Sequence, residues 1–235
     1  MPRFVQWLSV QIFSRIHAKF MGLVVRELEV WIAEAEILRQ VSLEVPTHSM
    51  VGLIGRNGAG KTTLIRSVMG LVPVRSGTVS FNEANLLNVS AHRRPHMGIG
   101  YMPEDRRLVP QLTVRDNILL PSWAASSGDD TGRLDWIYLL LPEVAEFSER
   151  KAIQLSGGQQ KLVALARALM AGSSLLLLDE PFEGVAPVLA RRLVEVLAKL
   201  KNQGISILLS ESDARHSSRL LDNLYVIERG QIRIR

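Results

Sequence analysis

A glycine-rich segment near the start of the chain holds the residues best suited to bind a phosphate. It runs Gly55-Arg56-Asn57-Gly58-Ala59-Gly60-Lys61-Thr62 and is followed by Thr63. Its three glycines let the backbone turn tightly and bring its N–H groups close to an anion. The lysine adds a full positive charge, and the threonine hydroxyl is an oxygen ligand of the kind that Mg²⁺ prefers. The pattern G-x-x-x-x-G-K-[ST], between a predicted strand and a predicted helix, indicates a nucleoside triphosphate site.

Two acidic residues, Asp179 and Glu180, follow the short apolar segment Leu175–Leu178. Asp179 is placed to bind Mg²⁺, directly or through water. Glu180 is placed to orient and partly deprotonate the water that attacks a terminal phosphate. Taken alone, an apolar run followed by two acids is common and could be a strand end with solvated carboxylates. Its position after a phosphate loop in the chain favours the catalytic interpretation.

A second glycine motif lies between these two, at Leu155-Ser156-Gly157-Gly158-Gln159-Gln160. Ser156 is able to cap the helix that follows and to donate to a phosphate oxygen. The two glycines leave room for a phosphate beside the backbone N–H groups. The alternative is a serine-glycine helix cap that binds no ligand. Because a predicted helical segment separates this motif from Lys61, we expect the two to serve different nucleotides.

The elements that must position these motifs follow from hydrophobic periodicity. The predicted strands are Leu23–Val30, Val41–Val45, Met50–Ile54, Gly77–Phe81, Ser174–Leu178, Ile205–Ser210, Leu224–Ile227 and Gln231–Ile234. The predicted helices are Lys61–Gly70, Gln159–Met170 and Pro187–Gln203. Between them, Leu86–Gln154 has helical periods broken by prolines 103, 110, 121 and 142, and Ser126–Gly132 is a predicted surface loop. Strands that alternate with helices predict an α/β fold with a mostly parallel sheet.

Composition limits the class of protein. The 235 residues carry a net charge of +5 and no cysteine, so a disulfide framework and a cysteine metal site are excluded. Arg3, Arg15 and Lys19 supply three of the positive charges, which leaves the rest of the chain almost balanced and argues against nucleic-acid binding. No apolar run approaches the ~18–20 residues of a membrane-spanning helix. Residues 1–21 form an extension with three interpretations: translation that begins at Met21, a weak interfacial helix, or a flexible arm.

From about Leu23 to the end, these motifs in this order resemble the ATP-binding subunits of ABC transporters. The resemblance implies a P-loop NTPase (RecA-like) core with a mostly parallel sheet, an N-terminal antiparallel β subdomain and an inserted α-helical subdomain at about 86–158. Together these would make an ABC ATPase domain of residues 22–235. It also implies that the Ser156 motif of one subunit covers the ATP and Mg²⁺ held by the phosphate loop of another. The segments Gly100–Arg107 and Asp179–Pro187 are most similar to branched-chain amino acid uptake ATPases, particularly the second of their two ATP-binding subunits.

The resemblance assigns further roles. Trp31 matches an aromatic residue that stacks on adenine, although core packing is its alternative. Glu104 replaces a glutamine that contacts Mg²⁺, which makes Thr62, Glu104 and Asp179 the predicted metal ligands. Ser212 replaces a switch histidine, so the predicted catalytic residues are Glu180, Lys61 and Ser212. Because serine is short and never cationic, we expect it to reach a terminal phosphate poorly and to make hydrolysis here slower than at a partner site.

The implied partners are transmembrane permease subunits, contacted through Glu104–Val114, and a second ABC ATPase subunit. A heterodimer is favoured over a homodimer, and a periplasmic or extracellular solute-binding protein takes part indirectly. We expect a peripheral location on the cytoplasmic face of the inner or plasma membrane, and uptake of a small polar solute such as a branched-chain amino acid. One rival is a nucleic-acid-linked ABC ATPase, but long coiled coils, zinc cysteines and tandem cassettes are missing from the sequence. The other rival is a regulatory subunit that binds ATP without hydrolysis.

Overall fold

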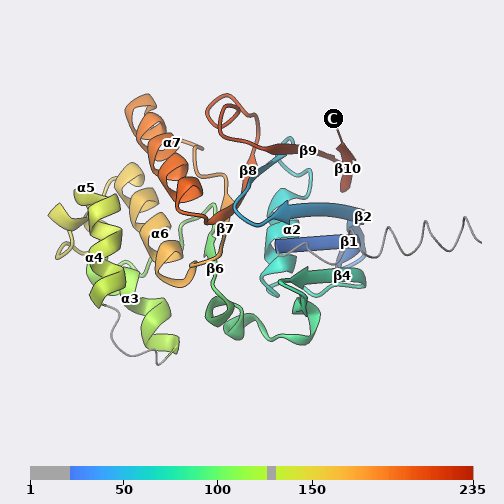
Figure 1. Ribbon diagram of the computed structural model, residues 1–235, viewed down its shortest axis with the longest axis horizontal. Helices are drawn as coiled ribbons and strands as arrows, with labels where there is room; N and C mark the ends of the chain where they lie inside the picture. The colour runs from blue at the N-terminus through green and yellow to red at the C-terminus, as the bar shows by residue number, and fades with distance from the viewer. Residues whose placement is uncertain (1–21, 126–130, 235) are drawn as a thin grey trace, which may run out of the picture.

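The computed structural model describes residues 22–125 and 131–234, which form two β-sheets and a layer of helices (Figure 1). The first sheet is antiparallel, with strand order β2-β1-β4-β5. Its strands are β1 (Gly22–Ile32), β2 (Ala35–Pro46), β4 (Ser76–Phe81) and β5 (Ala84–Asn85). Alternating apolar residues build β1 and β2, because one face of each strand is buried and the other is wet.

The second sheet has six strands in the order β10-β9-β3-β8-β7-β6. Its strands are β3 (Met50–Ile54), β6 (Ile99–Met102), β7 (Leu175–Asp179), β8 (Ser206–Glu211), β9 (Asn223–Glu228) and β10 (Gln231–Ile234). Every pairing is parallel except that of β9 with β10. The predicted α/β fold with a mostly parallel sheet and an N-terminal antiparallel sheet is therefore confirmed.

The helices follow the prediction at the ends of the chain and differ from it in the middle. They are α2 (Lys61–Val68), α3 (Val114–Ala125), α4 (Thr131–Leu140), α5 (Pro142–Glu146), α6 (Gly157–Ala171) and α7 (Pro187–Asn202). Four short 3₁₀ helices accompany them: η1 (Leu86–Asn88), η2 (Ala91–Arg93), η3 (Pro95–Met97) and η4 (Ala152–Gln154). The expected break at Pro121 is wrong, because α3 continues through it with Ile118 and Leu119 buried in the core.

The middle of the chain contains a strand that the sequence pattern does not predict. Strand β6 was missed inside the segment expected to be helical, because four residues between Gly98 and Pro103 are too few to show a period. The expected loop Ser126–Gly132 lies outside the described residues at 126–130, and its last two residues begin α4. Residues 1–21 also lie outside the described part of the chain.

The six-stranded sheet separates two hydrophobic cores. Leu175 and Leu177 of β7 face one core, which contains α2 and the antiparallel sheet. Leu176 and Leu178 face the other, which contains α3 to α7. Burial on both faces explains why β7 is a continuous apolar run, as central parallel strands usually are. The helical layer therefore stands on one face of the sheet and α2 on the other.

The boundaries of the helical subdomain stay a prediction. Leu86 packs in the core shared with the antiparallel sheet, and β6 belongs to the six-stranded sheet. Helices α3, α4 and α5 pack on α6. We therefore propose to begin the inserted helical part after Met102 rather than at about residue 86. Among the residues that the structure describes, none of the helices is both long and apolar enough to span a bilayer.

Arg94 is a buried cation that holds the carboxyl end of α2. It is 3% exposed, and its guanidinium donates to the carbonyl oxygens of Ser67 (3.1 Å), Leu86 (2.7 Å), Val89 (3.1 Å) and, at shorter range, Val68. Burial lowers its pKa. A cation at a helix carboxyl end is also favoured by the helix dipole. The residue thus fixes one end of the helix whose other end carries the phosphate loop.

We expect Arg94→Met to lower the free energy of unfolding by about 2–4 kcal/mol, because several buried carbonyl groups would lose their donor. Urea unfolding followed by circular dichroism measures the change. Arg93→Met is the matched control, since Arg93 is exposed one residue away and should tolerate the change. Equal losses in the two variants would show that the hydrogen bonds of Arg94 are not what stabilises this region.

Candidate active site

The phosphate loop connects β3 to α2, as the sequence predicts. Gly58 and Gly60 have φ values of +80° and +113°, which only glycine adopts without strain. Gly55 is required for another reason: a Cβ atom there would lie 2.4 Å from the carbonyl oxygen of Ile227. The first N–H groups of α2 have no intrahelical acceptor, and they open onto the space above the loop. The loop is therefore built to receive an anion.

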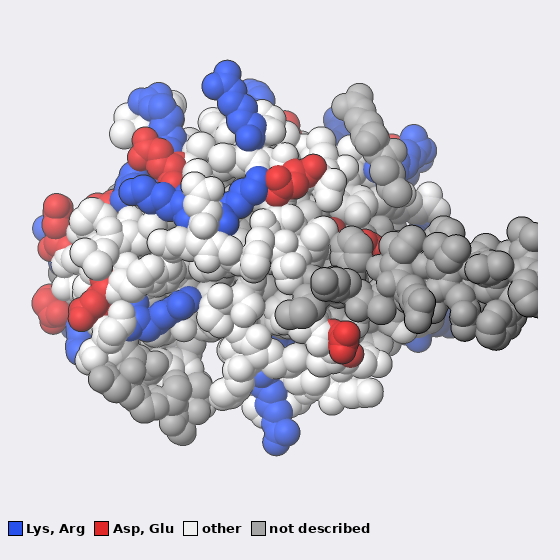
Figure 2. All heavy atoms as spheres, in the orientation of Figure 1, with Lys and Arg blue, Asp and Glu red and all other residues white. Residues whose placement is uncertain are grey.

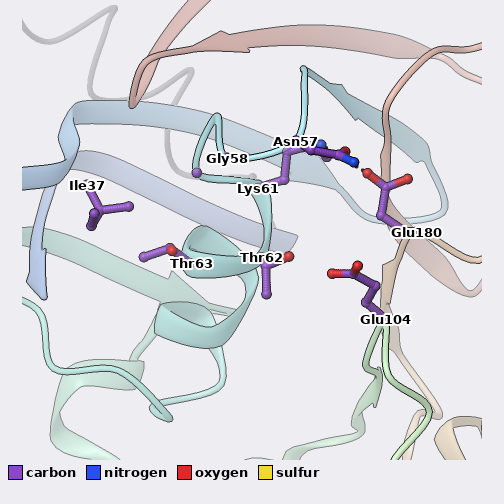
Figure 3. Close-up of a pocket in the computed structure, with 9 residues that line it drawn as sticks. Ile37, Asn57, Gly58, Lys61, Thr62, Thr63, Glu104 and Glu180 are labelled. Carbon is purple, nitrogen blue, oxygen red and sulfur yellow. Dashed lines mark ion pairs between the residues drawn. The ribbon is translucent and has the colours of Figure 1, made fainter.

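A cavity of about 350 Å³ lies against this loop (Figure 3). It is lined by Ile37, Asn57, Gly58, Gly60, Lys61, Thr62, Thr63, Glu104 and Glu180. Every one of these except Ile37 was predicted from the sequence. Ile37 comes from β2 and lies with Thr63 at the end of the cavity away from the two glutamates. Nothing in the sequence around Ile37 distinguishes it from other apolar residues of β2.

Lys61 and Glu180 form a buried ion pair at the cavity. The Nζ atom lies 2.9 Å from Glu180 Oε1 and donates to the carbonyl oxygens of Gly55 (2.5 Å) and Arg56 (3.2 Å). Both side chains are less than a tenth exposed. The lysine is thus fixed at the mouth of the phosphate loop, and the carboxylate of Glu180 points to the same place (Figure 3).

The backbone of Glu180 is strained, and both its N–H and its carbonyl group are hydrogen-bonded. Its φ is +49°, a conformation that costs energy for a residue with a Cβ atom. Its N–H donates to Ser210 Oγ (3.1 Å), and its carbonyl oxygen accepts from the buried Lys161 Nζ (2.8 Å). Lys161 belongs to α6, just after the second glycine motif. These contacts fix the backbone of Glu180 and connect it to the start of α6.

Asp179 is the last residue of β7, and only one of its carboxylate oxygens is hydrogen-bonded within the described residues. The side chain is fully buried, Oδ1 accepts from Ser210 Oγ (2.7 Å), and Oδ2 has no hydrogen-bond partner among the described residues. Burial raises its pKa, and the contact with Ser210 and the nearby Thr62 hydroxyl oppose that shift. A buried oxygen without a partner fits a site for Mg²⁺ or its water.

Glu104 approaches the same space from the loop after β6 (Figure 3). Burial raises its pKa, as do the neighbouring acids Glu183, Asp179 and Glu180, while Lys61 opposes the shift. The described residues contain no cluster of three or more His, Cys, Asp or Glu side chains able to hold a metal. Mg²⁺ held here would therefore need the Thr62 hydroxyl and phosphate oxygens as additional ligands.

Ser212 lies closer to the reacting groups than its short side chain suggested. Its Oγ atom is 3.1 Å from Glu180 Oε1 and 3.0 Å from Asn57 Oδ1, and its N–H donates to Glu180 Oε2 (3.2 Å). A hydroxyl has one proton to donate, so it serves one of the two oxygens at a time. Whether it reaches a phosphate stays a prediction, but it contacts the proposed general base directly.

We expect Ser212→His to raise ATP turnover, because an imidazole extends beyond the hydroxyl toward the cavity. Ser212→Ala is the matched variant, and it should lower turnover since Glu180 loses a hydrogen bond. Steady-state phosphate release at saturating ATP separates the two. If the histidine variant turns over no faster than the wild type, the missing histidine does not limit the rate.

The second glycine motif does not line this cavity. Ser156 caps α6: its Oγ accepts from Gln159 N (3.3 Å), and its own N–H donates to Gln159 Oε1 (3.0 Å). Ser156 and Gly157 are exposed. A Cβ atom on Gly158 would lie 2.8 Å from Leu189 Cδ2, so the end of the Leu189 side chain would have to shift to admit it. The motif forms a separate, outward-facing helix start.

Trp31 is half-buried and does not line the cavity either. The guanidinium carbon of Arg75 lies 4.7 Å from the ring centroid, a cation–π contact. Adenine stacking on Trp31 stays a prediction, and it would have to use the part of the ring that Arg75 leaves free.

Glu211, next to Ser212, is a buried acid that the site does not use. Its carboxyl is 4% exposed and neither oxygen has a hydrogen-bond partner among the described residues. Burial raises its pKa to about 7, and the nearby Ser217 hydroxyl opposes the shift without a hydrogen bond of normal geometry. The folded state therefore favours the neutral acid, and stability should fall as the pH rises from the ordinary pKa of 4.5 toward 7.

Between pH 5 and pH 8 the wild type should lose about 2–3 kcal/mol of unfolding free energy as Glu211 ionises. Glu211→Gln should not show this loss, since glutamine never ionises. Urea titrations of both proteins at the two pH values test this. Glu146→Gln, at an exposed position, should leave the pH dependence unchanged. A parallel pH dependence in wild type and Glu211→Gln would contradict the prediction.

The fold, the phosphate loop and the acidic pair define an α/β nucleoside triphosphatase. The family model of the ABC transporter matches residues 38–183. A high-affinity branched-chain amino acid transport ATP-binding protein, BraG of Pseudomonas aeruginosa, is 33% identical over 88% of this chain and 88% of its own. The lipopolysaccharide export system ATP-binding protein LptB of Escherichia coli is 30% identical over 83% of this chain and 82% of its own.

Solved structures agree. An ATP-binding cassette of an ABC transporter in its ADP conformation superposes with a TM-score of 0.77 at 29% identity, covering 90% of this chain and 89% of the other. A dimeric bacterial ABC transporter cassette has the same fold, with a TM-score of 0.81, 22% identity, and coverage of 89% and 96%. The chain belongs to the ABC transporter family. It is an ATP-binding subunit and an ATPase, of the peripheral kind that works with transmembrane permeases.

Proposed function

We propose that Lys61, Thr62 and the loop N–H groups hold the phosphates of ATP, and that Glu180 accepts a proton from the attacking water. The observation that carries this is the cavity that Lys61 and Glu180 share, with their side chains 2.9 Å apart. Both groups are buried and aimed before substrate arrives, so little rearrangement is needed at the reaction step. Ser212 orients Glu180.

Mg²⁺, when bound, would neutralise charge on the phosphates, with Thr62, Asp179 and Glu104 as its protein ligands. The unpaired Asp179 Oδ2 supports this assignment. The other predicted nucleotide contacts, Gly55, Arg56, Asn57, Gly58, Ala59, Gly60, Thr63 and Trp31, remain part of the proposal.

A second cassette would supply the Ser156 motif to complete the site. In this chain Ser156, Gly157, Gly158 and Gln159 begin α6 away from the Lys61 cavity, which supports their action on the nucleotide of a partner. We favour a heterodimer because Ser212 and Glu104 depart from the common family pattern. The proposed location is the cytoplasmic face of the inner or plasma membrane.

The proposed solute is a branched-chain or related amino acid, imported with the help of permeases and a periplasmic or extracellular solute-binding protein. The likeness to BraG and to a probable branched-chain amino acid transport ATP-binding protein of Archaeoglobus fulgidus supports it. Nucleic acid is not a proposed partner: the face drawn in Figure 2 mixes acidic and basic side chains around a largely uncharged centre, rather than forming a basic stripe.

The test is uptake of radiolabelled leucine by cells that lack this chain and are complemented with the wild type or with Glu180→Gln. Uptake restored by the wild type alone supports import driven by hydrolysis. The similarity to LptB, which belongs to an export system, suggests the result that would contradict import. Normal leucine uptake together with loss of surface lipopolysaccharide would show export and overturn the proposal.

A further inference from the structure

A second cavity, here called the arginine cavity, lies on the other side of the phosphate loop. Its volume of about 610 Å³ exceeds the 350 Å³ of the Lys61 cavity and lies within the ~300–1,000 Å³ usual for ligand sites. It is lined by Arg39, Arg56, Asn57, Gly58, Ala59, Ile227, Glu228, Arg229, Gln231 and Arg233. The walls come from β2, the phosphate loop and the β9–β10 hairpin.

Four arginines and one glutamate make this lining strongly basic. Arg233 Nη1 lies 3.6 Å from Glu228 Oε2, and Arg39 Nε lies 3.3 Å from Glu36 Oε2. Arg56 and Arg229 form no ion pair with the residues that the structure describes. At least two arginines of the lining therefore have no counter-charge from the described part of the chain.

The position of Arg229 is unusual for its residue type. It forms the hairpin turn with φ +49°, where asparagine or glycine is favoured and another residue costs ~1–2 kcal/mol. The turn is also fixed: Gly230 N donates to the Ala59 carbonyl (3.0 Å), and Arg39 N donates to the Gly230 carbonyl (2.8 Å). A rigid turn thus presents a charged side chain where the backbone alone would select a small one.

The chemistry of the lining selects the class of ligand. Guanidinium groups bind phosphate through paired hydrogen bonds. Ile227 and Ala59 are the apolar side chains of the lining, and both are buried, at 0% and 8% exposed. An acidic protein segment would lack the apolar or aromatic anchors on which such interfaces depend. We propose that the arginine cavity binds a small phosphorylated anion, at a site distinct from the nucleotide held by Lys61.

An anion bound in the arginine cavity should change how the phosphate loop binds the nucleotide. Asn57 and Gly58 line both cavities, and Asn57 also contacts Ser212. An anion among the arginines would restrict the loop between the two cavities. This coupling rests on the proposed function of the Lys61 cavity, whereas binding in the arginine cavity does not.

The experiment is calorimetric titration of inorganic tripolyphosphate into the full chain saturated with ADP and Mg²⁺. ADP binding is measured first, so a Lys61 cavity that does not bind nucleotide is detected before tripolyphosphate is added. We expect one further saturable site in the wild type. We expect the double variant Arg39→Gln/Arg229→Asn to bind tripolyphosphate at least about tenfold more weakly. Asparagine suits the positive φ better than arginine, so the turn should still form.

Arg191→Gln/Arg219→Gln is the matched control, because it also removes two exposed positive charges, both outside the arginine cavity. It should bind tripolyphosphate like the wild type. The absence of saturable binding in the ADP-loaded wild type would overturn the proposal. Equal affinity in the wild type and the double variant would overturn it as well, since binding would then not involve these arginines.

Discussion

Glu180→Gln should bind ATP normally and hydrolyse it about 10²- to 10⁴-fold more slowly, because glutamine keeps the shape of the side chain but cannot accept a proton. The contacts from Ser210 and Lys161 hold the backbone of residue 180 in place in either form, because they use its N–H and carbonyl groups. Phosphate release at saturating ATP measures turnover. Gel filtration with ATP and the partner subunit should show a complex that persists, since the step that ends ATP binding is lost.

The control for this change is Glu146→Gln, which removes a carboxylate from an exposed position of the helical layer and should leave turnover unchanged. A Glu180→Gln protein with more than a tenth of wild-type turnover would mean that another group acts as the base. The regulatory alternative, binding without hydrolysis, makes a different claim: wild type and variant would release phosphate equally slowly.

Lys61→Met should weaken ATP binding by at least tenfold and abolish turnover at moderate ATP concentrations, because the lysine that lines the Lys61 cavity is lost. It should also destabilise the empty protein, since Glu180 would be left buried without its partner. Fluorescent nucleotide titration measures the first effect and urea unfolding the second.

The double variant Lys61→Met/Glu180→Gln separates the two roles of the pair. If the buried ion pair stabilises the fold, the double variant should lose about 1–2 kcal/mol less unfolding free energy than the two single variants lose in sum. ATP binding should stay weak in it. Strict additivity of the stability losses would mean that the two charges are solvated independently, against the 2.9 Å contact.

The sequence located the phosphate loop, the acidic pair and most strands because each depends on local rules. Gly58 and Gly60 are needed for backbone turns, and Leu175–Leu178 is apolar because both faces of β7 are covered. Local sequence patterns did not predict the secondary structure of segments whose conformation depends on tertiary packing. Strand β6 is too short to show a period, and Pro121 is tolerated because α3 packs against α6.

Contacts between residues far apart in the chain could not be predicted. Ile37 enters the cavity only because β2 lies beside the loop, and Ser212 meets Asn57 across 155 positions. The expectation that serine reaches a terminal phosphate poorly rests on its short side chain and its lack of positive charge, and it stays a prediction. It did not include the course of β8, which pairs with β3 and β7 on either side and so brings Ser212 between the two motifs.

The two cores on opposite faces of the six-stranded sheet have a mechanical consequence. Helices α3, α4 and α5 rest on α6, whereas α2 and the phosphate loop are anchored in the other core. A rotation of the outer helices would displace α6, and the hydrogen bond from Lys161 would pass that displacement to the carbonyl group of Glu180. Lys161 is therefore a direct contact between the helical layer and the proposed general base, and a displacement of Glu180 would in turn act on Lys61 through their ion pair.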